Sequence, residues 1–317
     1  MNDVAITGIG IATPFGIGKE ALVSGLSGKR GLEFRRVPEF RGTRLKKQKA
    51  AGMPDSEAVD GRLPRKLLKY MSKAAKIGCL AGTEAAGDAG IQARYAPEAT
   101  AIFAASGLTA ANPDRAFRML NASVDEQGEF SERLFAEHGL EYMNPLNSFQ
   151  ILPNMPPCIL SIMIKARGPN LIFNPWEEQG AAAILEGVHS VRNNETGCAL
   201  VGAADTPDEP GTLVCLRQMN FLDDDTPASS AAAYLVLESR ETAEKDGRPI
   251  YGVLHSVEIE SRRARPFDPL AGVIGRTFAA APALLLAANL LGVSEATCLA
   301  GTRGSEIRFE IERTKKP

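Results

Sequence analysis

Histidine, tryptophan and paired cysteine are scarce in this chain. Its 317 residues include three histidines, one tryptophan and five cysteines. No two cysteines form a CxxC pair or show metal-ligand spacing, which argues against a zinc ribbon, an iron–sulfur cluster or a disulfide framework. Cysteines scattered in this way favour free thiols in a reducing cytoplasm. We therefore expect no metal and no other cofactor.

The chain also lacks a large excess of one charge and a long apolar run. Its 36 basic and 38 acidic residues leave a net charge of −2, which gives no general sign of a nucleic-acid or membrane partner. The longest strongly apolar stretch, residues 278–291, is short and alanine-rich for a membrane span. The first residues lead directly into a strand-like run, so no signal peptide is expected. These features favour a cytoplasmic location.

Apolar residues make up 44% of the chain, enough for a large buried core. Strand-like runs alternate with helical stretches, which indicates a layered α/β fold. The strands are expected at 4–11, 100–105, 171–173, 199–204, 232–238, 251–258 and 307–311, and the helices at 19–26, 63–89, 179–192 and 278–291, with residues 111–150 helical and irregular. No interdomain linker or short tandem repeat is evident.

Six phrases occur in the order and spacing of the β-ketoacyl-acyl carrier protein synthases, and the chain resembles that family along nearly its whole length. The most specific phrase combines Leu152-Pro-Asn-Met-Pro-Pro with Arg167-Gly-Pro-Asn, which together resemble the segment before the family's nucleophile. The others are Val4-Ala-Ile-Thr-Gly-Ile-Gly, the stretch 65–91, Val201-Gly-Ala-Ala-Asp, the stretch 231–238, and Ile274-Gly-Arg-Thr, where the family reads Gly-His-Thr.

The resemblance implies a thiolase-like fold, layered α-β-α-β-α, in one unit of two related halves. We expect the halves at roughly 1–195 and 196–317, with the second one shortened. The family dimerises through a strand that corresponds here to Leu171, Ile172 and Phe173.

The residues that carry the family's chemistry are replaced. A ketosynthase needs a cysteine at a helix N-terminus, where the helix dipole favours a thiolate, and two histidines that stabilise an enolate. The cysteine position holds Glu177, followed by Glu178, and the Gly-His-Thr histidine becomes Arg276. No histidine follows His255. The lysine position holds Ala271, a conserved acidic position holds Ser230, and the phenylalanine gate reads Gly301-Thr-Arg-Gly.

No other residue is a convincing substitute. Cys158 is expected to be a small buried apolar residue. His189 lies too far along the nucleophile helix to act on Glu177, and His138 and His255 have no visible catalytic setting. We therefore expect no catalytic residue in the ketosynthase sense.

The replacements suggest a filled site. A carboxylate is favourable at a helix N-terminus, and the arginine replaces a side chain that points at the nucleophile in the family. We expect Glu177 or Glu178 to form an ion pair with Arg276 in the former cavity. The alternative is that these side chains turn to solvent.

Basic residues suggest a docking surface. Five basic residues follow one another at spacings of four and three residues, namely Arg62, Lys66, Lys69, Lys73 and Lys76. On a helix this spacing would place them on one positive face, with Arg65 beside it. The resemblance implies that this face docks an acidic acyl carrier protein; the alternative is an ordinary solvated face. The basic segment 29–49 is interpreted as an exposed, solvated excursion.

Three functions follow. The first is an inactive, chain-length-factor-like partner of an active ketosynthase in fatty acid or polyketide synthesis, including aryl-polyene-type pathways. The second is an enzyme with altered chemistry, such as an acyl-carrier decarboxylase or hydrolase that uses Glu177 or Glu178. The third is a homodimeric scaffold. Co-purification of a ketosynthase tests the first, and a turnover assay tests the second.

Overall fold

The computed structural model describes residues 3–53, 56–109, 113–143 and 146–314. The strands are β1 (Val4–Thr13), β2 (Gly16–Ile17), β3 (Arg35–Arg36), β4 (Lys49–Ala51), β5 (Thr100–Ser106), β6 (Asn170–Phe173), β7 (Cys198–Asp205), β8 (Ala228–Ser229), β9 (Ala231–Ser239), β10 (Gly252–Ser261), β11 (Cys298–Ala300) and β12 (Ser305–Arg313). The helices are α1 (Lys19–Leu26), α2 (Ser56–Gly61), α3 (Arg65–Leu68), α4 (Lys73–Ala89), α5 (Pro113–Asn121), α6 (Glu132–Glu137), α7 (Asn147–Ile151), α8 (Met155–Ile164), α9 (Glu177–Arg192), α10 (Pro210–Gln218), α11 (Arg240–Lys245), α12 (Ala271–Ile274) and α13 (Ala281–Leu290). Five 3₁₀ turns are described: η1 (Pro38–Phe40), η2 (Ile91–Ala93), η3 (Pro97–Ala99), η4 (Gly139–Tyr142) and η5 (Phe278–Ala280).

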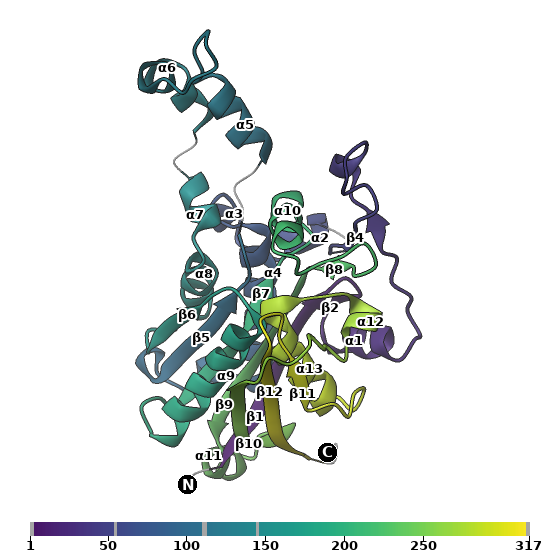
Figure 1. Ribbon diagram of the computed structural model, residues 1–317. Helices are drawn as coiled ribbons and strands as arrows, with labels where there is room; N and C mark the ends of the chain where they lie inside the picture. Colours follow the sequence, from purple (N-terminus) through teal and green to yellow (C-terminus); the bar gives the residue numbers. More distant parts are fainter. Residues whose placement is uncertain (1–2, 54–55, 110–112, 144–145, 315–317) are drawn as a thin grey trace.

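One mixed sheet of nine strands organises the chain, in the order β11-β12-β10-β1-β9-β7-β5-β6, with β2 paired to the end of β1 (Figure 1). Strand β1 is central and runs antiparallel to both β9 and β10. Strands β7, β5 and β6 run parallel to one another, whereas β10, β12 and β11 form an antiparallel extension. The buried, near-continuous apolar sequences of β1, β5, β7 and β9 are typical of strands covered on both faces.

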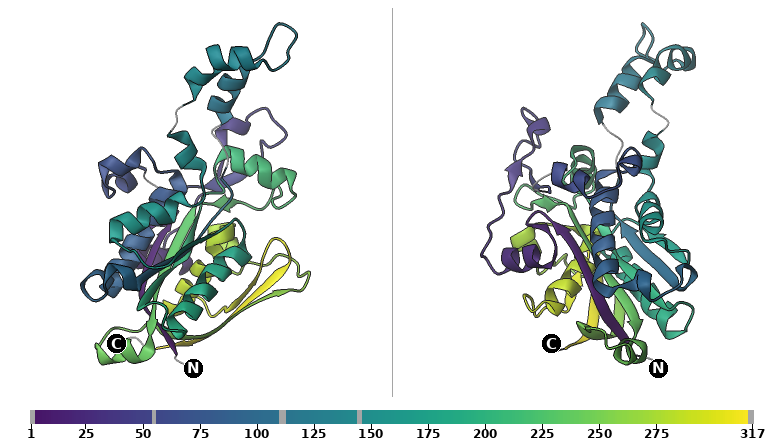
Figure 2. Two further views of the ribbon diagram at one scale, coloured as in Figure 1. Left: turned by 90° about the vertical axis from the view of Figure 1, so that its left-hand side faces the viewer. Right: turned by 180° about the vertical axis from the view of Figure 1, so that it is seen from behind.

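The two faces of this sheet carry different helices (Figure 2). Helices α4 and α8 pack on one face, while α9 and α13 pack on the other and also contact the β10–β12 ribbon. On that ribbon, Ile307 and Phe309 point into the core formed with α13, whereas Glu258, Arg308 and Glu310 on its other face are exposed. The second half of the chain therefore contributes a layer that is covered on one side.

Strand β1 and helix α4 lie unusually close together because two glycines of β1 carry no side chain. A Cβ added to Gly10 would lie 1.9 Å from the carbonyl oxygen of Ala81. The backbone N–H of Ile9 and that of Ile11 each donate at 3.0 Å to a carboxylate of α4, from Asp88 and Glu84 respectively. The Gly-Ile-Gly sequence therefore makes this strand–helix contact.

The expected strands are all present, with boundaries within one to three residues. The prediction of one helix over 63–89 is wrong. The chain forms α3 after Pro64, leaves helical geometry, and restarts as α4, whose N-cap Ser72 accepts a hydrogen bond from the Ala75 N–H at 3.1 Å. Gly90, at φ 64°, ends α4 as expected. The basic residues before α4 therefore do not share a helical face with those in it.

The expected division at about residue 195 stays a prediction. Strands β7 and β9, which follow that position, complete the sheet that β1 and β5 begin, and the antiparallel extension starts at β10. Within the described ranges, no helix is long and apolar enough to cross a membrane.

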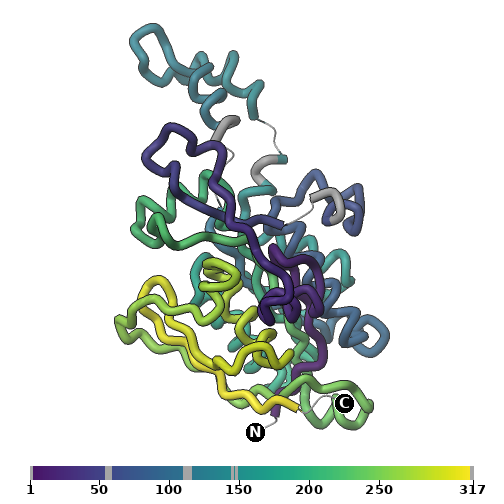
Figure 3. The backbone as a smooth tube through the Cα atoms, turned by 90° about the vertical axis from the view of Figure 1, so that its right-hand side faces the viewer, coloured from purple at the N-terminus to yellow at the C-terminus, as the bar shows by residue number. Residues whose placement is uncertain are grey.

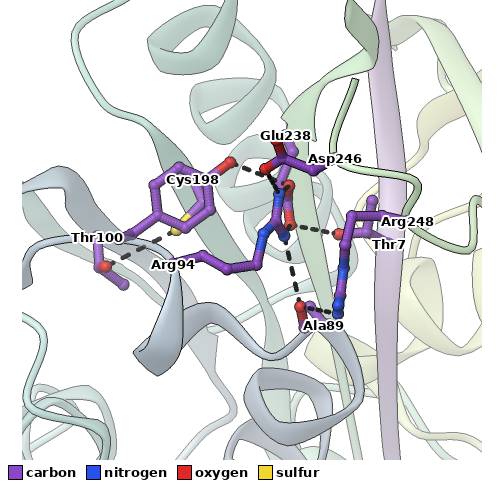
Figure 4. A network of polar contacts seen from close by, with 9 residues as sticks. Thr7, Ala89, Arg94, Thr100, Cys198, Glu238, Asp246 and Arg248 are labelled. Carbon is purple, nitrogen blue, oxygen red and sulfur yellow. Dashed lines mark hydrogen bonds and ion pairs between the residues drawn. The ribbon is translucent and has the colours of Figure 1, made fainter. Parts of the chain in front are cut away.

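A buried polar network fastens β9 to three other segments (Figure 4). The carboxylate of Glu238, fully buried, accepts hydrogen bonds from the Thr7 hydroxyl at 2.7 Å, the Arg94 guanidinium at 2.9 Å and the Tyr95 phenol at 3.0 Å. Arg94 also pairs with Asp246 at 2.9 Å. Burial and the charge of Glu238 raise the pKa of Tyr95, so its phenol keeps the proton that it donates.

We predict that Glu238→Gln lowers the free energy of unfolding by about 2–4 kcal/mol, because it leaves the Arg94 charge inside without its main partner. Urea denaturation followed by circular dichroism measures the loss. The matched control is Glu241→Gln on exposed α11, expected within about 0.5 kcal/mol of the unmodified chain. Equal losses in the two variants would contradict a specific role for the network.

Candidate functional site

The site begins where α9 starts. Glu177 is the first residue of this helix, directly after Trp176 at the N-cap, and only 1% of Glu177 is exposed. Its carboxylate lies at the positive end of the helix dipole, which favours an anion. Helix α9 can approach the η5 turn closely because a Cβ on Gly180 would lie 2.1 Å from the Ala279 carbonyl oxygen. The helix thus brings a buried negative charge against the segment 275–280.

Arg276 is held from the other side by its backbone. Its N–H donates to the Pro227 carbonyl at 2.9 Å, and its own carbonyl accepts from the Ser229 N–H at 2.9 Å. These bonds tie the arginine to β8, and the side chain is only 11% exposed. The guanidinium lies over the ring of Phe278, 4.9 Å from its centroid.

Glu177 and Arg276 form the ion pair that the filled-site hypothesis expects. Arg276 Nη2 lies 2.7 Å from Glu177 Oε1 and donates a second bond to Thr302 Oγ1 at 2.5 Å. The Thr302 hydroxyl donates to Glu177 Oε1 at 2.7 Å, and the Thr302 backbone N–H donates to Oε2 at 3.1 Å. Both carboxylate oxygens are therefore occupied.

Thr302 is the residue that sequence reasoning missed. It lies in the Gly301-Thr-Arg-Gly phrase, where the resemblance points only to the missing phenylalanine. Its signal was a small hydroxyl residue between two glycines in a loop that the resemblance places near the nucleophile. The loop can come close because Gly301 faces Glu177: a Cβ added to this glycine would lie 3.3 Å from the Glu177 Cβ.

Glu178 does not join the ion pair. Its side chain is half-buried, and Oε2 is a buried oxygen without a hydrogen-bond partner among the described residues. Burial raises the pKa of Glu178, the neighbouring charge of Glu177 acts in the same direction, and Arg303 opposes both. Of the two glutamates, Glu178 is thus the one that keeps an unpartnered carboxyl oxygen among the described residues.

Two further carboxylates border the network. Asp205, buried at the end of β7, accepts the Ala279 N–H at 3.1 Å; burial, together with the charge of Glu177, raises its pKa well above the ordinary range. This bond holds the turn in which Phe278 has a φ of 40°, a left-handed geometry that is costly for a residue with a side chain. Burial raises the pKa of Asp268 to about 6, although Arg276 opposes the shift.

The other candidate nucleophiles and bases lie elsewhere. Cys158 is exposed, so the prediction that it is buried is wrong: it lies on the outer side of α8, between the buried Pro157 and Ile159. His189 is exposed near the end of α9, about 18 Å along the helix axis from Glu177. His138 is exposed after α6, and His255 lies 3.6 Å from Glu312. The described ranges hold no metal-binding group of three or more His, Cys, Asp or Glu residues.

The residues suggested for carrier docking are separated by the break between α3 and α4. Four remain exposed, namely Arg62, Arg65, Lys66 and Lys69. Lys73 instead forms an ion pair with Asp208, and Lys76 pairs with Asp60 at 2.8 Å. The expected dimer strand, β6, lies at the edge of the sheet, where Leu171 is 47% exposed.

We predict that Arg276→Met lowers the free energy of unfolding by about 3–5 kcal/mol, because Glu177 would keep a buried charge without its partner. The double variant Glu177→Gln/Arg276→Met should recover much of this loss, since it removes both charges. Urea denaturation measures the three values. Arg303→Met, an exposed arginine of the adjacent loop, is the control and should change stability by less than about 0.5 kcal/mol. A double variant less stable than Arg276→Met would contradict the pairing.

Asp268 gives a pH prediction. Its folded-state pKa of about 6 exceeds the ordinary value of about 3.9, so the native state binds this proton more tightly than the unfolded state does. The stability contribution of Asp268 therefore falls as the pH rises from about 4 to about 6. Asp268→Asn should be more stable than the unmodified chain at pH 7, by at most about 3 kcal/mol, and the difference should shrink towards pH 4. Thermal denaturation across this pH range measures it, with Asp225→Asn, an exposed aspartate, as a control expected to show no such trend.

Solved structures share this architecture. A beta-ketoacyl synthase from Burkholderia phymatum superposes with a TM-score of 0.79 at 15% identity, covering 99% of this chain and 100% of that one. A type II polyketide synthase acyl carrier protein in complex with its ketosynthase gives 0.77 at 14% identity, and the ishigamide ketosynthase/chain length factor gives 0.75 at 17%, with 99% of this chain covered in each and 100% of the other chain. These neighbours confirm the thiolase-like, ketosynthase fold.

Relatives in sequence are polyketide proteins of Streptomyces. The chain is 24% identical over 278 residues to granaticin polyketide beta-ketoacyl synthase 1 of Streptomyces violaceoruber, and 24% identical over 270 residues to actinorhodin polyketide beta-ketoacyl synthase 1 of Streptomyces coelicolor. Each match covers 78% of this chain but only 61% and 55% of the respective relative. This chain thus spans little more than half of their length.

The family model named "Beta-ketoacyl synthase, N-terminal domain" matches residues 1–234. That range contains β1, α4, α9 and β7, the elements that place Glu177 and Asp205. Together with the shared fold, this match shows that the chain belongs to the beta-ketoacyl synthase family.

Proposed function

We propose that this chain is a non-catalytic, ketosynthase-like subunit that pairs with an active ketosynthase, in the manner of a chain length factor. The observation that carries the proposal is the buried network of Glu177, Arg276 and Thr302. Condensation needs a thiolate to hold the acyl chain and neutral imidazoles to stabilise the enolate. Here a carboxylate with both oxygens bonded and a permanently charged guanidinium occupy those positions.

The network also explains why residual ketosynthase chemistry is not expected. A carboxylate is a poorer nucleophile when charged and neutral donors hold its oxygens, and the Glu177 oxygens accept three bonds from Arg276 and Thr302. The site is occupied by the protein's own side chains, with the ion pair almost fully buried. We therefore assign this site a role in structure and in partner binding rather than in bond formation.

A partner is supported by exposed apolar surface. The edge strand β6 leaves one row of backbone groups unpaired within the described chain, and Leu171 is exposed beside it. The helices α5 and α6 project from the body (Figure 1), and this region exposes large apolar side chains, among them Phe117 of α5 at 70% and Phe130, just before α6, at 54%. Apolar surface of this kind is typical of protein interfaces. We propose that pairing along β6 and these helices joins the chain to its ketosynthase partner, with a second copy of this chain as the alternative.

The relatives favour polyketide synthesis as the pathway in which this chain works. Fatty acid and aryl-polyene-type pathways, which use the same condensation chemistry, are the alternatives. One solved neighbour is titled as a ketosynthase/chain length factor, and another contains an acyl carrier protein. Both support the proposed type of assembly, which would also meet an acyl carrier.

Glu178 favours a second candidate function. A half-buried carboxyl with a raised pKa and an unpartnered oxygen is suited to general acid–base chemistry, which a thioester hydrolase or a decarboxylase could use. The conservative variant Glu178→Gln separates this candidate from the first one, because it removes the titrating group and keeps the shape.

The test is co-expression of the tagged chain with an intact ketosynthase of a type II polyketide system, followed by co-purification and a condensation assay with malonyl and acyl carriers. We expect a stable complex, turnover by the complex, and no turnover by the tagged chain alone. Leu171→Glu should reduce recovery of the partner at least tenfold, because it buries a charge at the β6 edge.

Two results would overturn this proposal. Elongation of a thioester by the chain alone would show that it is itself a ketosynthase. Hydrolysis or decarboxylation that is lost in Glu178→Gln, in the absence of any captured ketosynthase, would favour the altered-chemistry enzyme. Lys245→Glu, at an exposed position on α11, is the matched control for an added charge and should leave partner recovery unchanged.

A further inference from the structure

Residues 29–49, here named the basic arm, concentrate positive charge on one exposed segment. They include two acidic residues, Glu33 and Glu39, and nine basic ones, every one of them exposed: Lys29, Arg30, Arg35, Arg36, Arg41, Arg44, Lys46, Lys47 and Lys49. The whole chain has 36 basic and 38 acidic residues, so the remainder holds 27 basic against 36 acidic ones. The arm is therefore a positive feature on an otherwise acidic protein.

Within the described part of the chain, these basic side chains form almost no ion pairs with acidic residues. Arg35 alone among the nine has a carboxylate partner there, at 3.0 Å, and that partner is Glu33 of the same arm. Elsewhere, by contrast, ion pairs are frequent, as for Lys73 with Asp208 and Lys76 with Asp60. Like charges this close repel one another, and an anionic partner would relieve the repulsion.

The arm is exposed, as expected, and ordered structure fastens it to the body. Strands β3 and β4 pair antiparallel, and β4 pairs parallel with β8 to form a three-stranded sheet. The side-chain amide of Gln48, fully buried, donates to the Thr226 carbonyl at 3.1 Å. Val37 and Phe40 are buried in the same apolar cluster as Trp176. The charged side chains are thus displayed from a fixed backbone, which lowers the entropic cost of docking.

The same contacts connect the arm to the candidate site. Ala50 of β4 is in register with Ala228 of β8, and Ala228 in turn bridges to Arg276. The ring of Phe34 lies 3.0 Å from where a Cβ on Gly275 would be. Figure 3 shows the arm, in purple, extending from the body towards the same end as α5 and α6. The positive surface therefore lies at the end of the molecule where the site loops meet.

We propose that the basic arm is a docking surface for an acidic protein, namely the acyl carrier protein that serves the complex. This inference rests on the proposed function and adds a location that differs from the α3–α4 residues suggested by the family resemblance. A protein is favoured over single-stranded nucleic acid because the arm offers no exposed aromatic ring for base stacking: Phe40 is buried and Phe34 is partly buried. The arm supplies the electrostatic attraction and fixes the orientation of the carrier protein. The body of the chain supplies the rest of the contact with it.

The experiment titrates a fluorescently labelled, purified holo acyl carrier protein of a type II system with the full chain, alone and in its ketosynthase complex. Fluorescence anisotropy gives the Kd at about 0.05 M and about 0.3 M salt. Lys46→Glu/Lys47→Glu should weaken binding about tenfold at the lower salt and should reduce the salt dependence. The matched control, Arg240→Glu/Lys245→Glu on α11, reverses the same amount of charge on another face, at the partly exposed Arg240 and the exposed Lys245, and should leave the Kd within about twofold.

Arg62→Glu/Lys66→Glu, in the α3 region, separates the two docking locations. A loss confined to this variant, or an unchanged Kd in the arm variant, overturns the proposal. Arm-dependent binding of a DNA duplex or of anionic phosphatidylserine vesicles without carrier binding overturns it as well. Failure to capture a ketosynthase removes the proposed function only, because titration of the chain alone still decides whether the arm binds the carrier.

Discussion

The buried ion pair between Glu177 and Arg276 is the constraint around which the candidate site is arranged. Two opposite charges that are almost removed from water are tolerated only when each is paired and hydrogen-bonded, and here Thr302 completes the bonding of the carboxylate. Four separate segments must therefore be held in place at once: the start of α9, the Arg276 segment, the loop at Thr302 and the end of β7. The central sheet provides that common support.

The same geometry that would serve a nucleophile serves this salt bridge. A helix N-terminus stabilises any anion placed on it, a thiolate or a carboxylate alike. Opposite it, a polar side chain on the turn before η5 reaches the same point. In the proposed function, the two charged side chains make this point a structural contact rather than a reaction centre. Asp205 then retains a purpose, since its bond to Ala279 holds the left-handed turn at Phe278.

The last part of the chain forms a layer beside the central sheet. Helix α13 still packs beside α9, and the β10–β12 ribbon still covers both helices, while its other face is exposed and charged. Helix α13 and this ribbon thereby support helix α9 and its N-terminus. The basic arm and the projecting helices α5 and α6 lie at the end of the molecule away from the β10–β12 ribbon (Figure 1). Partners of different chemistry can approach these different surfaces.

The sequence by itself determined the family and the positions of the strands along the chain, because apolar periodicity, glycine positions and local phrases are properties of short segments. It also indicated that Glu177 or Glu178 would meet Arg276, since the resemblance aligned these residues with the family's site. Only the tertiary structure decided that Glu177 rather than Glu178 forms the pair, that Thr302 closes the network, that Cys158 is exposed and that the helix over 63–89 is interrupted at Ser72. The physical reason is that side-chain direction at a helix start, exposure on a helix face and the competition between capping and continuing a helix all depend on which distant segments pack there, and one segment's sequence does not contain that information.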